Sequence, residues 1–176
     1  VLDLGEGRGT MESEEKGWID TVLGFWDDVV GDVMTHVSDI TAFPLDATDA
    51  GIQRTIRETG LSRYPVYGED IHDILGILNA REFLLDRMTG SPRPLRELLR
   101  PAYFVPDTLK ASALMQDMQS KKVHIAIVVD EYGDTAGLVT MEDLLEEIVG
   151  TIYDEFDPSE PAEIVALEPG LWRVSG

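Results

Sequence analysis

The order of strands, turns and helices expected for residues 39–90 occurs again in residues 103–150, about sixty residues further along the chain. Pro44 corresponds to Pro106 at an offset of 62, and Gly76 corresponds to Gly137 at an offset of 61. The run Tyr64–Val66 is aligned with Ile125–Ile127, also at an offset of 61. An offset this constant across three elements predicts an internal repeat, and a repeat constrains the fold more than any single element does.

Each copy of the repeat has the pattern strand, helix, strand, strand, helix. In the first copy we expect these elements at Asp39–Pro44, Asp49–Thr59, Arg63–Tyr67, Ile74–Leu78 and Ala80–Met88. In the second copy we expect them at Tyr103–Pro106, Leu109–Lys121, His124–Val129, Thr135–Val139 and Met141–Gly150, with a short helical turn at Leu95–Leu99 before them. The predicted fold class is therefore α+β, with tandem βαββα repeats.

The predicted domain organisation has four parts. Residues 1–31 form an acidic segment with an amphipathic helix, 32–90 the first repeat, 91–151 the second repeat, and 152–176 a linker followed by the start of a further domain. The helix is indicated by an apolar stripe that comprises Trp18, Ile19, Val22, Leu23, Trp26, Val29, Val30 and Val33. Residues 164–174 are typical of a β-hairpin around Pro169-Gly170.

Charge and composition exclude several functions. The chain carries 34 Asp and Glu against 14 Lys and Arg, a formal net charge of −20 that disfavours binding to nucleic acid or to anionic lipid. It contains no cysteine and no apolar run long enough to span a membrane. Two interpretations of the charge remain open, a surface that keeps the protein soluble and a switch that responds to cations.

No catalytic constellation is present in the sequence. The three histidines, His36, His72 and His124, belong to no triad and to no zinc-binding pair, and no phosphate-binding glycine loop occurs. Adjacent acidic residues such as Glu146 and Glu147 point in different directions on a helix, which favours solvation over catalysis. We therefore expect neither an enzyme nor a metal site.

A strand-to-helix junction that occurs in both copies is the main candidate for binding. In the second copy, Thr140 stands where the strand ends and Asp143 follows three residues later, the spacing of a helix capping box. The same geometry offers free N–H groups to a phosphate and a carboxylate to a ribose. Capping alone and ligand binding are both consistent with this spacing. In the first copy Asn79 and Glu82 take these positions, so we expect a capping box there too but an asymmetric pair of sites.

These residues resemble a known family. The strand that ends in proline, the Gly-x-x-Thr-x-x-Asp junction and the period near sixty residues are similar to CBS domains, which pair into nucleotide-binding Bateman modules. The runs Ser62–Tyr67, His124–Gly133 and Gly137–Gly150 resemble the CorC/hemolysin C family, which is linked to magnesium and cobalt efflux, and also the similar cyclin M transporters. Residues 164–174 are similar to the first strands of that family's C-terminal domain.

The resemblance implies a regulatory function and a set of ligand contacts. It implies binding of ATP or AMP at Ile40, Thr41, Ala42, Ser62, Arg63, Tyr64, Pro65, His124, Thr140 and Asp143. The net charge of −20 favours ATP that carries bound magnesium, which is less negative than free ATP. Asp143 would hold the ribose, Thr140 the phosphate, and the backbone at residues 40–42 the adenine. It further implies a homodimer, a transmembrane domain in the parent protein and a cytoplasmic location for this part. The alternative is a structural dimerisation module that binds no nucleotide.

Overall fold

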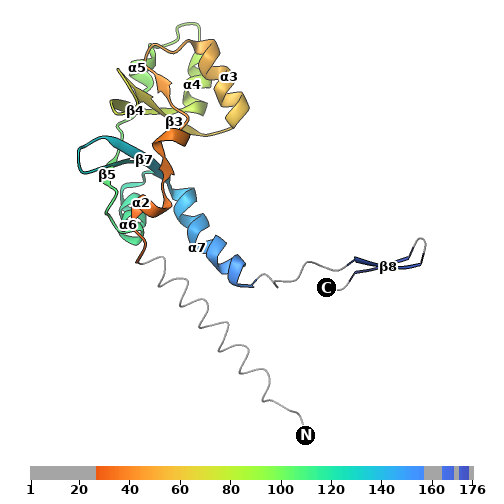
Figure 1. The fold of residues 1–176 in the computed structure, drawn as a ribbon. Coiled ribbons are helices and arrows are strands. Elements are labelled where there is room, and N and C mark those ends of the chain that lie inside the picture. Colours follow the sequence, from red (N-terminus) through yellow and green to blue (C-terminus); the bar gives the residue numbers. More distant parts are fainter. Residues whose placement is uncertain (1–26, 157–163, 169–170, 175–176) are drawn as a thin grey trace.

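The computed structural model describes residues 27–156, 164–168 and 171–174, and it confirms the α+β class with two βαββα units (Figure 1). The first copy consists of β2 (Phe43–Pro44), α3 (Asp49–Thr59), β3 (Arg63–Tyr67), β4 (Ile74–Asn79) and α4 (Ala80–Arg87). The second copy consists of β5 (Phe104–Pro106), α6 (Ala111–Lys121), β6 (Ile125–Val129), β7 (Thr135–Thr140) and α7 (Met141–Phe156). The two copies lie one above the other in Figure 1.

Both copies have the same strand pairing. The strands β2 and β3 are parallel, as are β5 and β6, because a helix connects the members of each pair. Short turns make β3 and β4 antiparallel, and likewise β6 and β7. The sheet of the first copy has the order β2-β3-β4, and that of the second copy has the order β1-β7-β6-β5. The strand β6 is buried over its first four residues, as its apolar sequence predicts.

The same backbone conformation ends the first helix of each copy. The side chain of Thr48 accepts a hydrogen bond from the Gly51 N–H at 3.2 Å and so caps the start of α3. The helix ends at Gly60, whose φ of 66° lies in the left-handed region that glycine adopts without strain. In the second copy Lys122 ends α6 with a φ of 55°. Both helices therefore stop where the sequence predicts, although only one of them stops at a glycine.

The strand register corrects one alignment between the copies. Arg63 pairs with Asn79 in the first copy, and Ile125 pairs with Thr140 in the second. Because Asn79 and Thr140 are 61 residues apart and Arg63 and Ile125 are 62 apart, β3 corresponds to β6 at an offset of 62. The predicted offset of 61 for this strand is wrong by one residue, since the turn that follows it is one residue shorter in the second copy.

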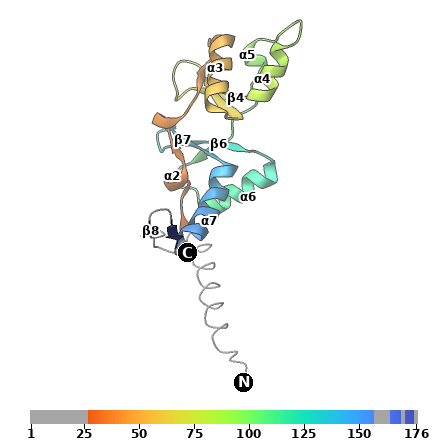
Figure 2. The same ribbon diagram turned by 90° about the vertical axis from the view of Figure 1, so that its right-hand side faces the viewer.

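The two copies exchange their preceding helices, as Figures 1 and 2 show. The helix α2 (Val30–Val33) precedes the first copy, but Val30 is fully buried in the core of the second copy. The helix α5 (Leu95–Leu98) follows the first copy and packs into that copy's own core through Leu98. Each core is therefore completed by the segment that precedes the other copy, and neither copy buries its apolar surface alone.

The strand that follows each exchanged helix is part of the same exchange. In β1 (Thr35–His36), Thr35 pairs with Leu138 in the second copy, and in the first copy Arg100 forms the equivalent bridge to Ile77. A glycine allows each close approach. A Cβ at Gly137 would collide with the Thr35 carbonyl oxygen, and a Cβ at Gly76 would lie 2.7 Å from the Arg100 carbonyl oxygen. The two corresponding glycines of the repeat thus have a packing function.

Two predictions at the N-terminal side are wrong. The apolar stripe does not form one helix to Val33, because Val29 is extended and bridges to Lys110, which leaves α2 as a separate single turn. The stripe residues Trp18–Trp26 lie outside the described residues. The predicted strand at 39–44 is shorter than expected, since Val37–Asp39 forms the 3-10 helix η1 and only Phe43–Pro44 pairs.

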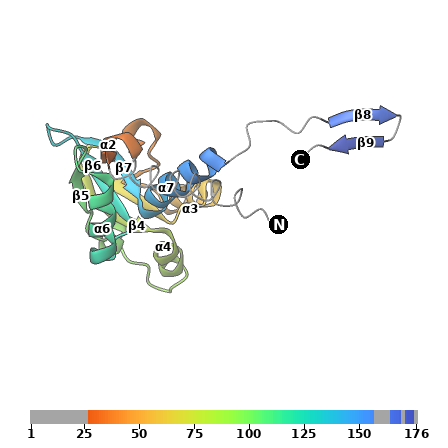
Figure 3. The same ribbon diagram turned by 90° about the horizontal axis from the view of Figure 1, so that it is seen from below.

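At the C-terminal side, α7 continues to Phe156, so residues 152–156 are helical and not part of a linker. The predicted hairpin is confirmed, with β8 (Ile164–Glu168) and β9 (Leu171–Val174) antiparallel, as Figure 3 shows. Within the described ranges, no helix is both long enough and apolar enough to cross a membrane.

Candidate functional site

A cavity of about 490 Å³ lies between the two copies. Three segments line it: residues 35–41, which follow α2; residues 60–63, which connect α3 to β3; and the strand-to-helix junction of the second copy with the start of β6. The lining residues are Thr35, Asp39, Ile40, Thr41, Gly60, Leu61, Ser62, Arg63, His124, Ile125, Leu138, Thr140, Glu142 and Asp143. The cavity is thus assembled from both copies and from the exchanged segment.

Seven of the ten residues singled out from the sequence line this cavity, namely Ile40, Thr41, Ser62, Arg63, His124, Thr140 and Asp143. Ser62 and His124 occupy equivalent positions, because their carbonyl oxygens accept the first N–H of α4 and of α7, each at 3.0 Å. Residues of both copies that are far apart in the sequence therefore line the same cavity.

Three of the ten residues do not line the cavity: Ala42, Tyr64 and Pro65. Side chains on a strand alternate between its faces, so Tyr64 points away from the face of Arg63. Its ring is fully buried in the first core, 5.0 Å from the Phe43 ring, and its hydroxyl lies 2.7 Å from the hydroxyl of Thr59. Pro65 is also buried, further along β3.

The sequence motifs missed seven residues that line the cavity: Thr35, Asp39, Gly60, Leu61, Ile125, Leu138 and Glu142. Most of them are sequence neighbours of the predicted residues and line the cavity because they belong to the same segments. Thr35 carried no signal, because it reaches the cavity only through the exchange of β1 onto β7. Asp39 belongs to η1, which the sequence indicated as strand.

The junction of the second copy is a complete capping box. The Asp143 N–H donates to the Thr140 Oγ1 at 3.2 Å, and the Thr140 N–H donates to the Asp143 Oδ2 at 3.0 Å. Both side chains are half-buried and line the cavity. Because an ionised carboxylate has about four acceptor positions, Asp143 keeps acceptor capacity beyond its bond to Thr140. The junction therefore satisfies its own backbone and still offers an acceptor to a ligand.

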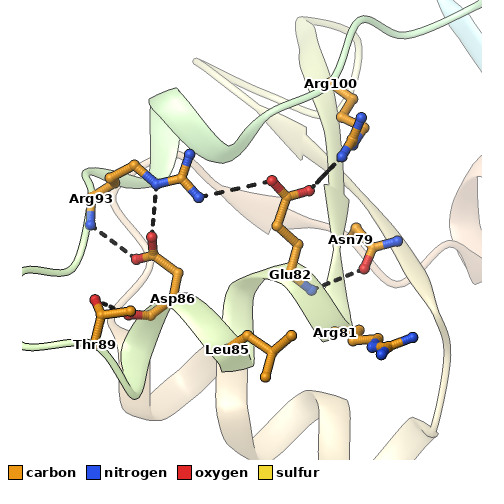
Figure 4. A pocket seen from close by; sticks show the side chains of 8 residues that line it. All are labelled: Asn79, Arg81, Glu82, Leu85, Asp86, Thr89, Arg93 and Arg100. Carbon is orange, nitrogen blue, oxygen red and sulfur yellow. Dashed lines mark hydrogen bonds and ion pairs between the residues drawn. The ribbon is translucent and has the colours of Figure 1, made fainter.

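The junction of the first copy has only half of the expected capping box. The Glu82 N–H donates to the Asn79 Oδ1 at 3.0 Å, but the Glu82 carboxylate does not return to the Asn79 backbone. It accepts a hydrogen bond from Arg100 at 2.8 Å and lies 3.8 Å from Arg93 (Figure 4). The prediction of a full capping box here is wrong, because two arginines offer the longer glutamate a stronger partner.

Further ion pairs surround this junction (Figure 4). The buried carboxylate of Asp86 accepts hydrogen bonds from the Arg93 side chain at 2.7 Å and from the Arg93 N–H at 2.9 Å. The Arg93 hydrogen bond holds the pKa of Asp86 below its usual range, although burial acts in the opposite direction. Asp86 and Glu82 thereby fix the segment between the two copies against α4. The carboxylate oxygens of both residues therefore already accept hydrogen bonds from arginines of the same chain.

The described side chains do not include a ready metal-binding cluster. Within those ranges no group of three or more His, Asp or Glu side chains lies close enough together to hold a metal ion. The three carboxylates that line the cavity, Asp39, Glu142 and Asp143, therefore do not form a ready ligand set. A cation at this place would need ligands from another molecule as well.

The comparisons with known proteins agree with this architecture. The CBS domain model matches residues 95–150. The magnesium and cobalt efflux protein CorC of Pasteurella multocida is 37% identical over 175 residues, which cover 99% of this chain and 58% of that protein. This chain spans between 28% and 58% of the length of eight curated relatives.

Solved structures extend the likeness to the fold. One is the CBS domain of the bacterial CNNM/CorC family Mg²⁺ transporter in complex with ATP, with 39% identity, a TM-score of 0.71 and coverage of 77% of this chain and 97% of that one. Another is a CBS-domain pair with bound AMP from Klebsiella pneumoniae, with 31% identity, a TM-score of 0.62 and coverage of 69% and 98%. The chain therefore belongs to the CBS-domain modules of the CNNM/CorC family.

Proposed function

We propose that this chain is a regulatory module that binds one adenine nucleotide, ATP or AMP, in the cavity between its copies. The observation that carries the proposal is that Thr140 and Asp143 line the same 490 Å³ cavity as Arg63, Ile40 and Thr41. Two CBS structures similar to this chain contain ATP and AMP respectively. The volume is within the range of small-molecule sites.

The chemistry of the lining residues matches the parts of a nucleotide. The start of α7 offers the positive end of the helix dipole and the Thr140 hydroxyl to a phosphate. The Arg63 guanidinium is a second phosphate donor. Asp143 has acceptor capacity for ribose hydroxyls, and the backbone of residues 40–41 supplies main-chain groups for the base. The residues Ile40, Thr41, Ser62, Arg63, His124, Thr140 and Asp143 form the proposed site.

The charge of the cavity favours a nucleotide that carries magnesium. Three carboxylates line it, Asp39, Glu142 and Asp143, against the single guanidinium of Arg63. The chain as a whole has a net charge of −20, so the free nucleotide tetra-anion meets repulsion at long and at short range. Bound magnesium removes part of that repulsion. We propose that magnesium-bound ATP binds more tightly than free ATP and that the neutralisation favours compaction of a dimer.

Only one nucleotide binds per chain in this proposal. In the first copy the position equivalent to Asp143 is Glu82, whose carboxylate is engaged by Arg100 and Arg93. Asn79 replaces Thr140 and is used to cap α4. A ribose at this place would have to displace the ion pairs of Glu82, and the first copy offers no hydroxyl equivalent to that of Thr140.

The second proposed partner is another copy of the chain. Leu84 of α4 and Met88, the C-cap of that helix, are 37% and 83% exposed, and Leu145 and Val149, 61 residues later on α7, are 44% and 46% exposed. Exposed apolar pairs thus occur at equivalent positions of both second helices. A surface that repeats itself in this way suits an isologous contact between two identical molecules. We propose that the homodimer forms through these helices.

The parent protein is proposed to be a divalent-cation efflux protein of the inner membrane, with this module on its cytoplasmic side. The support is the 37% identity to the CorC protein of Pasteurella multocida, of which the chain spans 58%. A module of this kind regulates transport and catalyses no reaction. The competing candidate is a structural dimerisation module without nucleotide, which the exposed apolar pairs of α4 and α7 equally support.

Thermal stabilisation by AMP, ADP and ATP, each with and without magnesium, distinguishes the two candidates. A nucleotide that binds only the folded chain raises the melting temperature with its concentration. We expect stabilisation of the unmodified chain, its loss in Asp143→Ala, and its retention in the matched variant Glu82→Ala. If none of the nucleotides stabilises the unmodified chain, the structural candidate is correct. If ATP stabilises equally with and without magnesium, the magnesium proposal is wrong.

A further inference from the structure

We infer that a ligand in the cavity fastens residues 35–41, here called the strap, to the second copy. The strap connects α2 to β2, and all of the chain before residue 35 reaches the first copy through it. Ligand occupancy would thereby control how firmly the incoming chain is docked. This inference rests on the proposed function, because it takes the adenine nucleotide as the occupant of the cavity.

The strap is held weakly in the structure. Its pairing with β7 comprises two residues, Thr35 with Leu138 and His36 with Gly137. The helix η1 that follows is three residues long and has no side-chain cap. Every strap residue is half-buried or exposed, so little apolar burial holds the segment in place. Four strap residues, Thr35, Asp39, Ile40 and Thr41, line the cavity.

The equivalent segment of the first copy is fastened by its own side chain. Arg100 lies opposite Ile77, as Thr35 lies opposite Leu138, and it donates to Glu82 at the start of α4 at 2.8 Å. In the second copy the two equivalent positions are Thr35 and Asp143. Asp143 instead accepts from the Thr140 N–H, and among the described residues no hydrogen bond or ion pair joins Asp143 to Thr35. The cavity occupies the space between them.

The strap is also longer than its equivalent. Thr35 and Arg100 are 65 residues apart, whereas the next aligned pair, Phe43 and Val105, are 62 apart, so the first copy has three additional residues. These three match the length of η1, Val37–Asp39, which turns Asp39 and Ile40 to the cavity. The additional residues help to form one wall of the cavity. Among the described residues, this segment has no ion pair equivalent to that between Arg100 and Glu82. A ligand that touches both the strap and α7 replaces that ion pair as the connection.

Thermodynamic linkage gives this arrangement a measurable consequence. If the nucleotide binds the docked strap better than the undocked one, docking and binding favour each other by the same factor. A change that undocks the strap without touching the cavity side chains must then weaken the nucleotide. A change that fastens the strap permanently must remove the effect of the nucleotide on it.

Hydrogen exchange of the full chain with and without ATP and magnesium tests the first part. We expect slower amide exchange at residues 35–41 when nucleotide is bound and no change at residues 100–103, the equivalent segment. Calorimetry on the same samples separates two failures. If no nucleotide binds, the proposed function is wrong. If nucleotide binds and exchange at residues 35–41 is unchanged, only the present inference is overturned.

Gly137→Ala tests the second part, with Gly76→Ala as its matched control. A Cβ at Gly137 would collide with the Thr35 carbonyl oxygen and lie 2.7 Å from the Met34 Sδ, which displaces the strap. We expect nucleotide affinity to fall about tenfold in Gly137→Ala. Gly76→Ala displaces the Arg100 segment, outside the cavity, and should leave the affinity unchanged. Equal affinities of both variants and the unmodified chain contradict the inference.

Thr35→Arg provides a test that does not depend on Gly137→Ala remaining folded. It gives the strap the side chain that Arg100 has in the first copy, within reach of the acidic start of α7. We expect slow exchange at residues 36–41 without nucleotide and little further change when ATP and magnesium are added. If exchange in Thr35→Arg is as fast without nucleotide as in the unmodified chain and responds equally to it, the inference is wrong.

Discussion

Arg100 donates to the Glu82 carboxylate at 2.8 Å and thereby joins the segment before the second copy to the helix that ends the first copy. Within the part of the chain that the structure describes, no such pair occupies the equivalent place in the second copy, where Thr35 and Asp143 line the cavity. The two copies share a fold and differ in what connects their parts at this junction. The difference is the basis for assigning one ligand site to each chain.

The Arg100–Glu82 pair should contribute little to global stability. The side chains are 69% and 33% exposed, so solvent screens their attraction. We expect a coupling energy of about 0.5 kcal/mol in a double-mutant cycle of Arg100→Ala and Glu82→Ala, measured by chemical denaturation. A coupling several times larger would show that the pair is needed for folding and not only for local fastening.

The Thr140 side chain should stabilise the start of α7. It accepts a hydrogen bond from the Asp143 N–H, and Thr140→Ala removes that acceptor. We expect a loss of about 1 kcal/mol in the free energy of unfolding without nucleotide. Thr140→Ser keeps the hydroxyl and should stay close to the unmodified chain. If both variants lose the same amount, the methyl group and not the cap is responsible.

The Asp86–Arg93 contact should make stability depend on acid pH. The Arg93 hydrogen bond lowers the pKa of Asp86 from 3.8, so the folded chain favours the ionised carboxylate. The resulting stabilisation is fully present above that value and is lost as pH falls below it towards the folded pKa. Melting temperatures between pH 6 and pH 3 should therefore fall less steeply in Asp86→Asn than in the unmodified chain. Equal slopes in Asp86→Asn and the unmodified chain would contradict the assignment.

The exchange of helices predicts where a core substitution acts. Leu98 is 2% exposed and packs in the first core, although it follows the predicted boundary between the copies. Leu98→Ala should cost about 3 kcal/mol of unfolding free energy. Amide exchange should increase first in α3, β3 and α4. The matched variant Leu85→Ala, at a position 55% exposed, should be nearly neutral. If Leu98→Ala speeds amide exchange only in the second copy, Leu98 does not support the first core as described.

Elements with local signals were predictable from the sequence. The helix α3 was predicted at Asp49–Thr59, where the structure places it, because the Gly60 stop and the Ile52–Ile56 spacing are both local. The strands β3 and β4 followed from apolar runs bounded by turns. The hairpin was predictable from Pro169-Gly170 between two strand patterns.

Features that depend on distant contacts were not predictable. Nothing near Thr35 indicates that it pairs with Leu138, more than one hundred residues away, so its place in the cavity was missed. Tyr64 was assigned to the site by its neighbours, yet strand alternation buries it in the core. The partner of Glu82 was missed for a similar reason, because Arg100 approaches through the exchanged segment.

Calorimetric titration of the chain with ATP and magnesium measures how many nucleotides each chain binds. We expect one nucleotide bound per chain, no measurable binding in Asp143→Ala, and unchanged stoichiometry and affinity in Glu82→Ala. Two nucleotides per chain, or equal binding by the unmodified chain and Asp143→Ala, would contradict this expectation.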